Sequence, residues 1–104
     1  MSRGSSRVRR RHESAQEAAF TGMLAAAMQD ASHVLVGGEV FSADYLQLPD
    51  EFTQPDDVLV EGSGVGHDLL LTRRDFDGAR RVGPSDIVLA DGTLVRFLRA
   101  ASVH

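Results

Sequence analysis

The chain has 104 residues, of which 42% are hydrophobic and 25% are charged, and its formal net charge at pH 7 is -4. These proportions are those of an ordinary globular domain, and they exclude a wholly disordered chain. No apolar run approaches the roughly 20 residues that a helix needs to cross a bilayer, so we predict a cytoplasmic origin and no membrane partner. The chain has no cysteine, which excludes disulfides and thiolate metal sites.

Positive and negative charges are segregated along the sequence. The first dozen residues contain no acidic residue and hold five arginines, at Arg3, Arg7, Arg9, Arg10 and Arg11. Residues 13–72 contain no Lys or Arg and carry most of the acidic residues. Opposite patches steer association with copies of the protein or with other partners, although chance clustering on a solvated surface is the alternative. We predict a basic N-terminal arm, residues 1–13, followed by a single domain, residues 14–104.

One amphipathic helix is predicted near the start of this domain. Ser14 and Glu17 have the spacing of a capping box, with Ser14 as the N-cap. Apolar residues then recur with the spacing of one helical face, at Phe20, Met23, Leu24, Ala27, Met28 and Ala31. We expect this face to pack on a core. The alanine-rich opposite side is small enough for a second backbone to approach, although an ordinary core helix is the simpler interpretation.

Short runs with β-strand character follow the helix. They are separated by turn residues and lie at 33–36, 39–41, 57–61, 68–72, 86–89 and 94–98. Asp91-Gly92 between the last two runs predicts a tight antiparallel hairpin. The fold class is therefore α+β, with one N-terminal amphipathic helix followed by a small antiparallel β-barrel or sandwich. The connection of residues 42–56 is too apolar for a solvated linker, so we expect it to pack on the sheet or on a partner.

Motifs for catalysis are weak. The stretch Gly62-Ser63-Gly64-Val65-Gly66 follows a predicted strand, but no Gly-Lys-Ser/Thr follows it, so it predicts a hairpin turn in place of a nucleotide loop. Ser63, His67 and Asp68 are merely adjacent in one turn, which does not give the converging geometry of a catalytic triad. Asp56-Asp57 is typical of a solvated turn. We predict that the protein is not an enzyme and has no catalytic residue.

No metal or cofactor site is predicted either. The four histidines are dispersed along the chain, at His12, His33, His67 and His104. A metal site built from histidines needs ligands that converge, and an i, i+4 pair is absent here. Each histidine is more simply interpreted as a surface or half-buried residue.

The order of elements from Gly38 to Ala100 resembles the λ-type head-tail attachment (head completion) proteins of long-tailed bacteriophages. The pattern consists of a strand ending Val58-Leu59-Val60-Glu61-Gly62-Ser63, a glycine turn, the strand 69–72, the link 73–79, and Arg81-Val82-Gly83 with Asp86 soon after. A hairpin then closes through Asp91-Gly92 into residues 94–98. The sequence departs from the family in the inserted Pro84-Ser85, in its end soon after Leu98, and in its longer basic arm.

The resemblance implies a structural virion protein that acts by assembly. Such a protein forms a ring of its own copies in the phage neck, follows the portal or adaptor protein, and presents a docking surface to the tail terminator or tail tube protein. DNA passes through its channel without sequence-specific binding, so the lumen should be acidic or neutral, because arginines would trap phosphates. We expect these residues to face the channel: Asp50, Glu51, Asp56 and Asp57. We expect these to meet partners: Arg7, Arg9, Arg10, Arg11, Arg73, Arg74, Arg80 and Arg81.

Two other classes of function stay open at this point. One is a small DNA-binding regulator that uses the arginine arm on phosphates, and the other is a prophage-encoded host-interaction or inhibitor protein. The acidic body and the single predicted helix speak against the regulator, because a helix-turn-helix needs a second helix to read a groove. The arm itself has three interpretations: an anchor onto an adjacent ring, a tail that touches DNA nonspecifically, or a disordered terminus.

Overall fold

A helix and one antiparallel sheet make up the part of the chain that the computed structural model describes, residues 18–50 and 52–99. The predicted N-cap Ser14, the basic arm and Glu51 lie outside these residues. The helix covers residues 18–28. It is followed by β1 (Ala31–Val36), β2 (Glu39–Leu46), β3 (Val58–Ser63), β4 (Asp68–Thr72), the 3-10 helix η1 (Arg73–Phe76), β5 (Arg80–Arg81), β6 (Asp86–Val88) and β7 (Leu94–Arg99). The predicted α+β class is confirmed.

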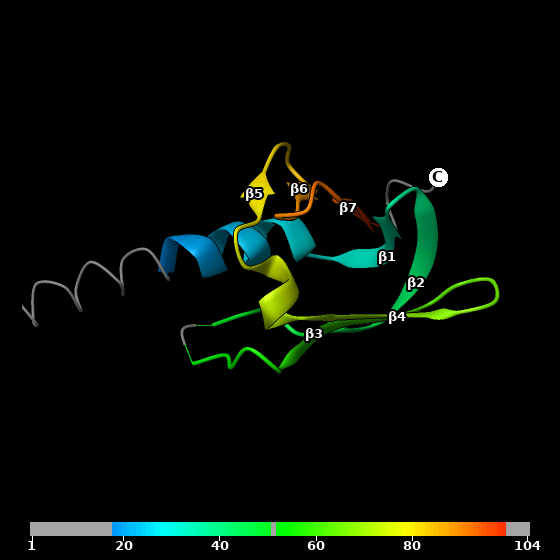
Figure 1. Cartoon of the computed structure of the whole chain (residues 1–104), viewed down its shortest axis with the longest axis horizontal. Coiled ribbons are helices and arrows are strands. Elements are labelled where there is room, and N and C mark those ends of the chain that lie inside the picture. Colours follow the sequence, from blue (N-terminus) through cyan, green and yellow to red (C-terminus); the bar gives the residue numbers. More distant parts are fainter. Residues whose placement is uncertain (1–17, 51, 100–104) are drawn as a thin grey trace, which may run out of the picture.

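The seven strands form a single sheet in the order β4-β3-β2-β1-β7-β6-β5, and every neighbouring pair is antiparallel. The sheet curls into an open half-barrel, with β4 at one edge and β5 at the other (Figure 1). The predicted antiparallel sheet is therefore present and curled. It forms a single layer, an open half-barrel, and is neither a closed barrel nor a two-layer sandwich. In the described residues no helix is long and apolar enough to cross a membrane.

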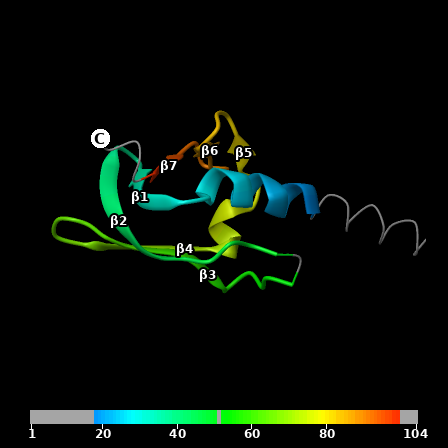
Figure 2. The ribbon, with the colours of Figure 1, turned by 180° about the vertical axis from the view of Figure 1, so that it is seen from behind.

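The inner face of the curled sheet carries the core. Val34 on β1 lies opposite Phe41 on β2 and Phe97 on β7, and Val95 lies opposite Ile87 on β6. All five side chains are buried, as expected where alternate residues of each strand face the core. The same core also includes Leu24, Ala27, Met28, Leu59, Val60, Leu71 and Phe76. The sheet, the helix and η1 thus share one hydrophobic core, and the helix is seen from both sides in Figures 1 and 2.

The predicted apolar face of the helix is confirmed over most of its length. Phe20 and Met23 are partly buried against the core, next to the fully buried positions of the following turns. Ala31 differs from the prediction, because it begins β1. The helix ends before it, and Asp30 has a φ of 60°, a left-handed conformation that Asp tolerates better than most side chains and that stops a helix.

Strand β2 is longer than the predicted run of residues 39–41. It extends to Leu46, and its second half pairs with β3 through Ser42 opposite Ser63 and Tyr45 opposite Glu61. The register shifts between Ala43 and Tyr45, which makes Asp44 the extra residue of a β-bulge. The connection to β3 therefore begins at residue 47, and five residues predicted to lie in it belong to the sheet. The two-residue strand β5 was also not predicted.

The glycine-rich stretch forms the predicted hairpin between β3 and β4. The Gly64 N–H donates to the His67 carbonyl at 2.9 Å, and Gly66 has a φ of 90°, which glycine adopts without strain. A Cβ atom on Gly62 would lie 2.7 Å from the Ser42 carbonyl oxygen, and one on Gly64 would lie 2.7 Å from two ring carbons of Phe41. Close packing and turn geometry therefore account for all three glycines.

The hairpin predicted from Asp91-Gly92 joins β6 and β7. Its turn is closed by two bonds, from the Leu89 N–H to the Thr93 carbonyl and from the Gly92 N–H to the Leu89 carbonyl, both at 2.9 Å. Gly92 has a φ of 93°. Asp91 caps the turn by accepting a hydrogen bond from the Thr93 N–H at 2.9 Å.

This cap gives the hairpin a dependence on pH. The backbone and side-chain hydrogen bonds from Thr93 hold the pKa of Asp91 below its usual 3.8. Because the folded-state pKa is depressed, the stabilisation is present above the unfolded-state pKa and is lost as the pH falls through the folded-state value. We expect Asp91→Ala to unfold at lower urea concentration than the wild type at pH 7. The difference between the two urea midpoints should become smaller below pH 3.8, the usual pKa of an aspartate. The matched variant Asp91→Asn keeps an acceptor oxygen but cannot titrate. A difference that stays constant down to pH 2 would contradict this account.

Candidate functional site

The connection between β2 and β3 is held to its neighbours at both ends, in its described residues 47–50 and 52–57. The Gln47 N–H donates to the Leu59 carbonyl at 2.9 Å, so the chain leaves β2 alongside β3. At the other end, the Arg73 N–H donates to the Asp57 carbonyl at 2.9 Å, and the Arg74 N–H donates to the Pro55 carbonyl at 3.0 Å. The backbone of η1 therefore holds the end of the connection in place.

All four acidic residues predicted to face a channel belong to this segment; the structure describes three of them, and Glu51 is outside the described residues. Asp50 is exposed, and its Oδ1 accepts hydrogen bonds from the Phe52 N–H at 2.8 Å and from the Thr53 hydroxyl at 3.1 Å. Asp57 is half-buried and accepts a hydrogen bond from the Gln54 N–H at 2.7 Å. Both carboxylates shape turns and still add negative charge to the surface.

Asp56 is the third of these residues, and it forms an ion pair. Its Oδ1 lies 3.1 Å from Nη2 of Arg74, and both side chains are largely exposed. Exposed pairs of this kind contribute roughly 0–1 kcal/mol to stability, so the pair is a surface feature more than a stabilising element. It links an acidic residue predicted to face DNA with an arginine predicted to meet a partner.

Apolar side chains also project from the connection. Phe52 is 76% exposed and Leu48 is 53% exposed, whereas Pro49 is buried. The connection was predicted to pack on the sheet or on a partner. Pro49 does pack within the subunit, whereas the large apolar side chains of Leu48 and Phe52 remain at the surface.

Arg73 has a different place from the other arginines predicted to meet partners. Its side chain is only 11% exposed, Nη1 lies 2.8 Å from Oδ1 of Asp77, and the guanidinium carbon lies 4.2 Å from the centroid of the Phe20 ring. Arg73 therefore connects η1 with the helix inside the subunit and is not part of an exposed basic surface. The sequence placed Arg73 with Arg74, Arg80 and Arg81 at an interface, because the order of charges along the chain does not show which side chain is buried.

The exposed arginines of the last third are Arg74, described above, the pair Arg80-Arg81 of β5, and Arg96 of β7, whose Nε lies 2.8 Å from Oδ1 of Asp86. Arg81 donates from Nε to the Gly83 carbonyl at 3.0 Å and from Nη2 to the Pro84 carbonyl at 3.2 Å. These bonds fix the guanidinium without neutralising it. The five arginines of the arm, four of which are predicted to meet partners, lie outside the described residues.

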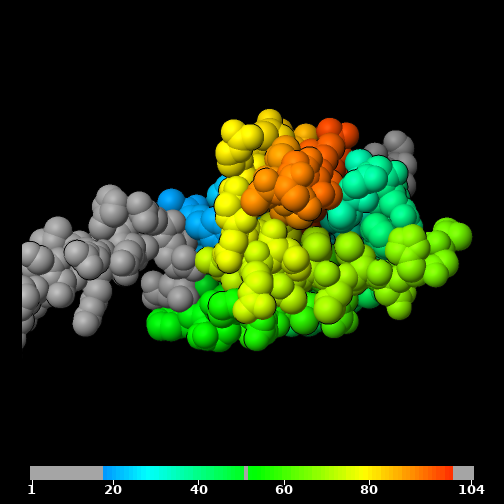
Figure 3. All heavy atoms as spheres, in the orientation of Figure 1, coloured from blue at the N-terminus to red at the C-terminus, as the bar shows by residue number. Residues whose placement is uncertain are grey.

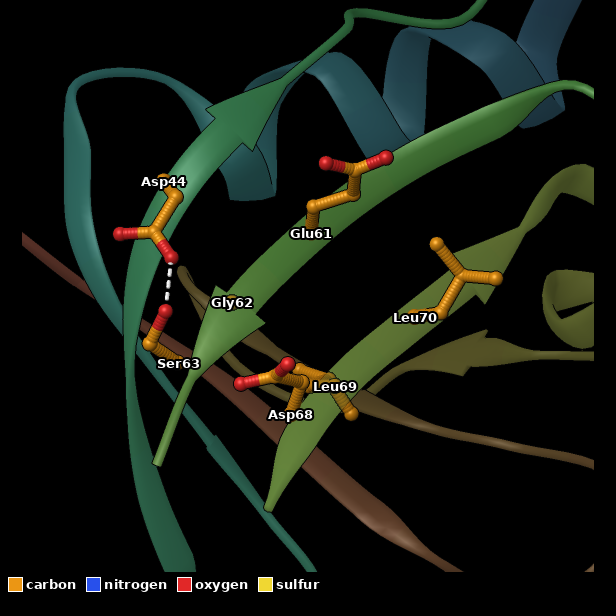
Figure 4. A pocket seen from close by; sticks show the side chains of 7 residues that line it. All are labelled: Asp44, Glu61, Gly62, Ser63, Asp68, Leu69 and Leu70. Carbon is orange, nitrogen blue, oxygen red and sulfur yellow. Dashed lines mark hydrogen bonds between the residues drawn. The ribbon is translucent and has the colours of Figure 1, made fainter. Parts of the chain in front are cut away.

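A groove lies on the outer surface of β2, β3 and β4 (Figure 4). Its volume is about 280 Å³, and three carboxylates line it, one from each strand: Asp44, Glu61 and Asp68. The Ser63 hydroxyl donates a short hydrogen bond to Asp44. These three acids belong to the acidic middle of the chain, but the sequence did not predict that they share a groove, because the second half of β2 has no clear strand pattern.

The residues considered for a triad point to different partners. The Ser63 hydroxyl is bonded to Asp44, and Nε2 of His67 lies 2.9 Å from Oε2 of Glu39. The His67 ring also packs edge-on against Phe41, with 5.5 Å between the ring centroids. Each of these contacts serves to hold the β3–β4 hairpin against β2.

Metal-ligating side chains do not converge in the part of the chain that the structure describes. No group of three His, Asp or Glu residues there has an arrangement that could hold a metal ion. The three groove carboxylates form a negatively charged surface on the described part of the chain.

Comparisons with known proteins give no family for this chain. No protein-family model matches it, and neither the curated proteins nor the solved structures give a match.

Proposed function

We propose that this protein is a ring-forming head-tail connector of the neck of a long-tailed bacteriophage, and that it acts by binding without turnover. The observation that carries the proposal is the separation of opposite charges on exposed surfaces of one small sheet: acids on the groove and connection, arginines on β5. Each copy can then bind its neighbour through one surface and keep another for DNA or the tail. The resemblance of residues 38–100 to head-tail attachment proteins supports the same assignment.

In this proposal the connection of residues 47–57 faces the channel. Asp50 and Asp56 are exposed there and add negative charge to a segment whose end is held by the backbone of η1. A lumen with net negative charge lets duplex DNA pass, because it does not trap the phosphates, and the exposed Arg74 beside this segment is paired with Asp56. Leu48 and Phe52 on the same segment give a partner an apolar contact.

Removal of the gene from the phage tests the proposed function. We expect DNA-filled heads and free tails to accumulate, as counted by electron microscopy of lysates, and infectious particles to return when the wild-type gene is supplied from a plasmid. Normal virions without the gene would overturn the proposal.

The binding properties of the isolated protein separate this function from that of a DNA-binding regulator. A connector that lets DNA pass should show no duplex binding near physiological salt, since the described surface is mainly acidic. Tight binding that weakens steeply as salt rises would instead favour the regulator. A density map of the neck with residues 47–57 on the outer wall would overturn the channel placement alone.

A further inference from the structure

Strand β4 forms one edge of the sheet. Among the described strands it pairs only with β3, so its other side has no partner in the part of the chain that the structure describes. Leu70 on this strand is 57% exposed. It lies opposite Glu61, which in turn lies opposite Tyr45 on β2, so the three residues form a row across three strands. We call Glu61, Asp68 and Leu70 the β4 surface.

Backbone groups at this edge point outward. The Gly64–His67 bond closes the hairpin, and hydrogen-bonded and non-hydrogen-bonded pairs alternate along an antiparallel ladder from that point. Asp68 and Leu70 therefore belong to non-hydrogen-bonded pairs, and their N–H and carbonyl groups face away from β3. An exposed edge of this kind is a template for association unless charge or shape protects it.

The charges of the β4 surface are not neutralised within the described chain. No arginine or histidine in residues 18–50 and 52–99 forms an ion pair with Glu61 or Asp68. The surface is therefore negative around one exposed leucine, and the partner that fits it is positive around an apolar side chain.

The opposite edge of the same sheet has that chemistry. Strand β5 consists of Arg80 and Arg81, both exposed, and Val82 follows directly with 57% of its surface exposed. Arg80 forms no ion pair with another described residue. We call these three residues the β5 surface. In the space-filling view the yellow residues around 80 and the yellow-green residues of the β3–β4 hairpin occupy separate places on the molecule (Figure 3).

We propose that copies of this protein associate head to tail, with the β4 surface of one copy against the β5 surface of the next. Glu61 and Asp68 meet Arg80 and Arg81 of the neighbour, and Leu70 meets its Val82. The β4 edge is complementary to the β5 edge of another copy but not to a second β4 edge, so the contact is heterologous. A heterologous contact forms a closed ring when the rotation from one copy to the next adds up to a full turn. Because β5 is only two residues long, charge and apolar contact contribute more than backbone pairing. The inference rests on the proposed function only in assuming that copies meet in a ring.

Charge reversal on each surface tests the contact. Asp68→Arg makes the β4 surface repel the β5 surface of an identical copy, and Arg80→Glu does the same from the other side. A mixture of the two variants restores every contact, because each arginine-bearing β4 surface then meets a glutamate-bearing β5 surface and each wild-type surface also finds its complement. The double variant Asp68→Arg/Arg80→Glu restores the contacts within one protein.

Light scattering of the full chain at low ionic strength is the measurement. We expect the average mass of the wild type to rise above the 11.2 kDa of one chain as concentration increases, and to fall again as salt screens the charges. Each single variant should associate at least about tenfold more weakly, while the mixture and the double variant should regain wild-type behaviour.

Matched controls place the same charge elsewhere. Ala19 and Gly22 are exposed on the helix, and nothing lies within 4 Å of the Cβ position at Gly22. Ala19→Arg/Gly22→Arg adds the same two positive charges as Asp68→Arg, and Ala19→Glu/Gly22→Glu adds the same two negative charges as Arg80→Glu. Both controls should associate like the wild type, and far-ultraviolet circular dichroism checks that every variant is folded.

Two results would overturn the contact. One is a wild type that stays monomeric at low salt up to about 10⁻⁴ M, a concentration at which weak specific contacts are populated. The other is a mixture of the single variants that fails to regain association. Neither result bears on the connector function, which the count of filled heads and free tails tests independently.

Discussion

Replacing Phe76 by alanine is expected to lower the free energy of unfolding by about 3–5 kcal/mol, the usual cost of removing a buried phenylalanine. Phe76 has no exposed surface and ends η1, the short helix between β4 and β5. Its ring joins the core shared by the sheet and the helix. Urea unfolding followed by circular dichroism measures the change, and the reference is the wild type at the same pH and temperature.

The same substitution at Phe52 is the matched control. Phe52 is 76% exposed at the tip of the connection, so Phe52→Ala should change the free energy of unfolding by no more than about 0.5 kcal/mol. Equal losses for the two variants would show that η1 is not packed as described. If Phe52→Ala left stability unchanged but impaired attachment of tails, it would identify Phe52 as a contact for the neighbouring neck protein.

Replacing Gly62 by alanine is expected to lower the free energy of unfolding by about 1–3 kcal/mol, the range found when a group is forced into a packed site. The added Cβ would lie 2.7 Å from the Ser42 carbonyl oxygen and 3.1 Å from Cβ of Phe41. The first of these is backbone of the neighbouring strand, so β2 and β3 must separate locally. Urea unfolding again gives the measurement, and the amide signals of Ser42 and Gly62 should shift in an NMR spectrum.

The same change from glycine to alanine at Gly22 is expected to stabilise the protein. It lies on the exposed side of the helix with open space at its Cβ position, so Gly22→Ala should raise the free energy of unfolding by about 0.5–1 kcal/mol through helix propensity alone. A loss of stability at Gly22, or none at Gly62, would contradict the placement of these two glycines.

The two variants at Gly62 and Phe76 also bear on assembly, because both residues support the edges of the sheet. Gly62 lies in the strand next to β4, and η1 links β4 to β5. Loss of packing at either position should therefore loosen the β4 and β5 surfaces together. Variants of exposed charges, by contrast, change the contact between copies and leave the core intact.

Local patterns in the sequence were sufficient for the elements that depend on near neighbours. The apolar spacing from Phe20 to Met28 predicted the buried face of the helix, and Asp91-Gly92 predicted the β6–β7 hairpin. The glycine-rich stretch likewise predicted a turn, because glycine supplies the positive φ found at Gly66. In each case the physical cause, helical periodicity or turn geometry, lies within a few residues.

The second half of strand β2 could not be predicted from local sequence patterns. Residues 42–46 contain Ser42, Asp44 and Tyr45, and they were predicted to belong to a connection; serine and aspartate are common in turns, so these residues carry no clear strand signal. Pairing with β3 made them a strand, with Asp44 placed in a bulge. The register of strands far apart in the sequence depends on how both fit the core, which no short window contains.

The sequence by itself thus determined the α+β class, the helix face, the hairpins and the segregation of charge along the chain. Only the tertiary structure decided which charges share a surface. It buried Arg73 beneath Phe20, brought Asp44, Glu61 and Asp68 to one groove, and placed β4 and β5 at opposite edges of the sheet. The physical reason is that burial and strand pairing depend on contacts between residues far apart in the sequence. The order of charged residues along the chain, by contrast, can be read directly from the sequence.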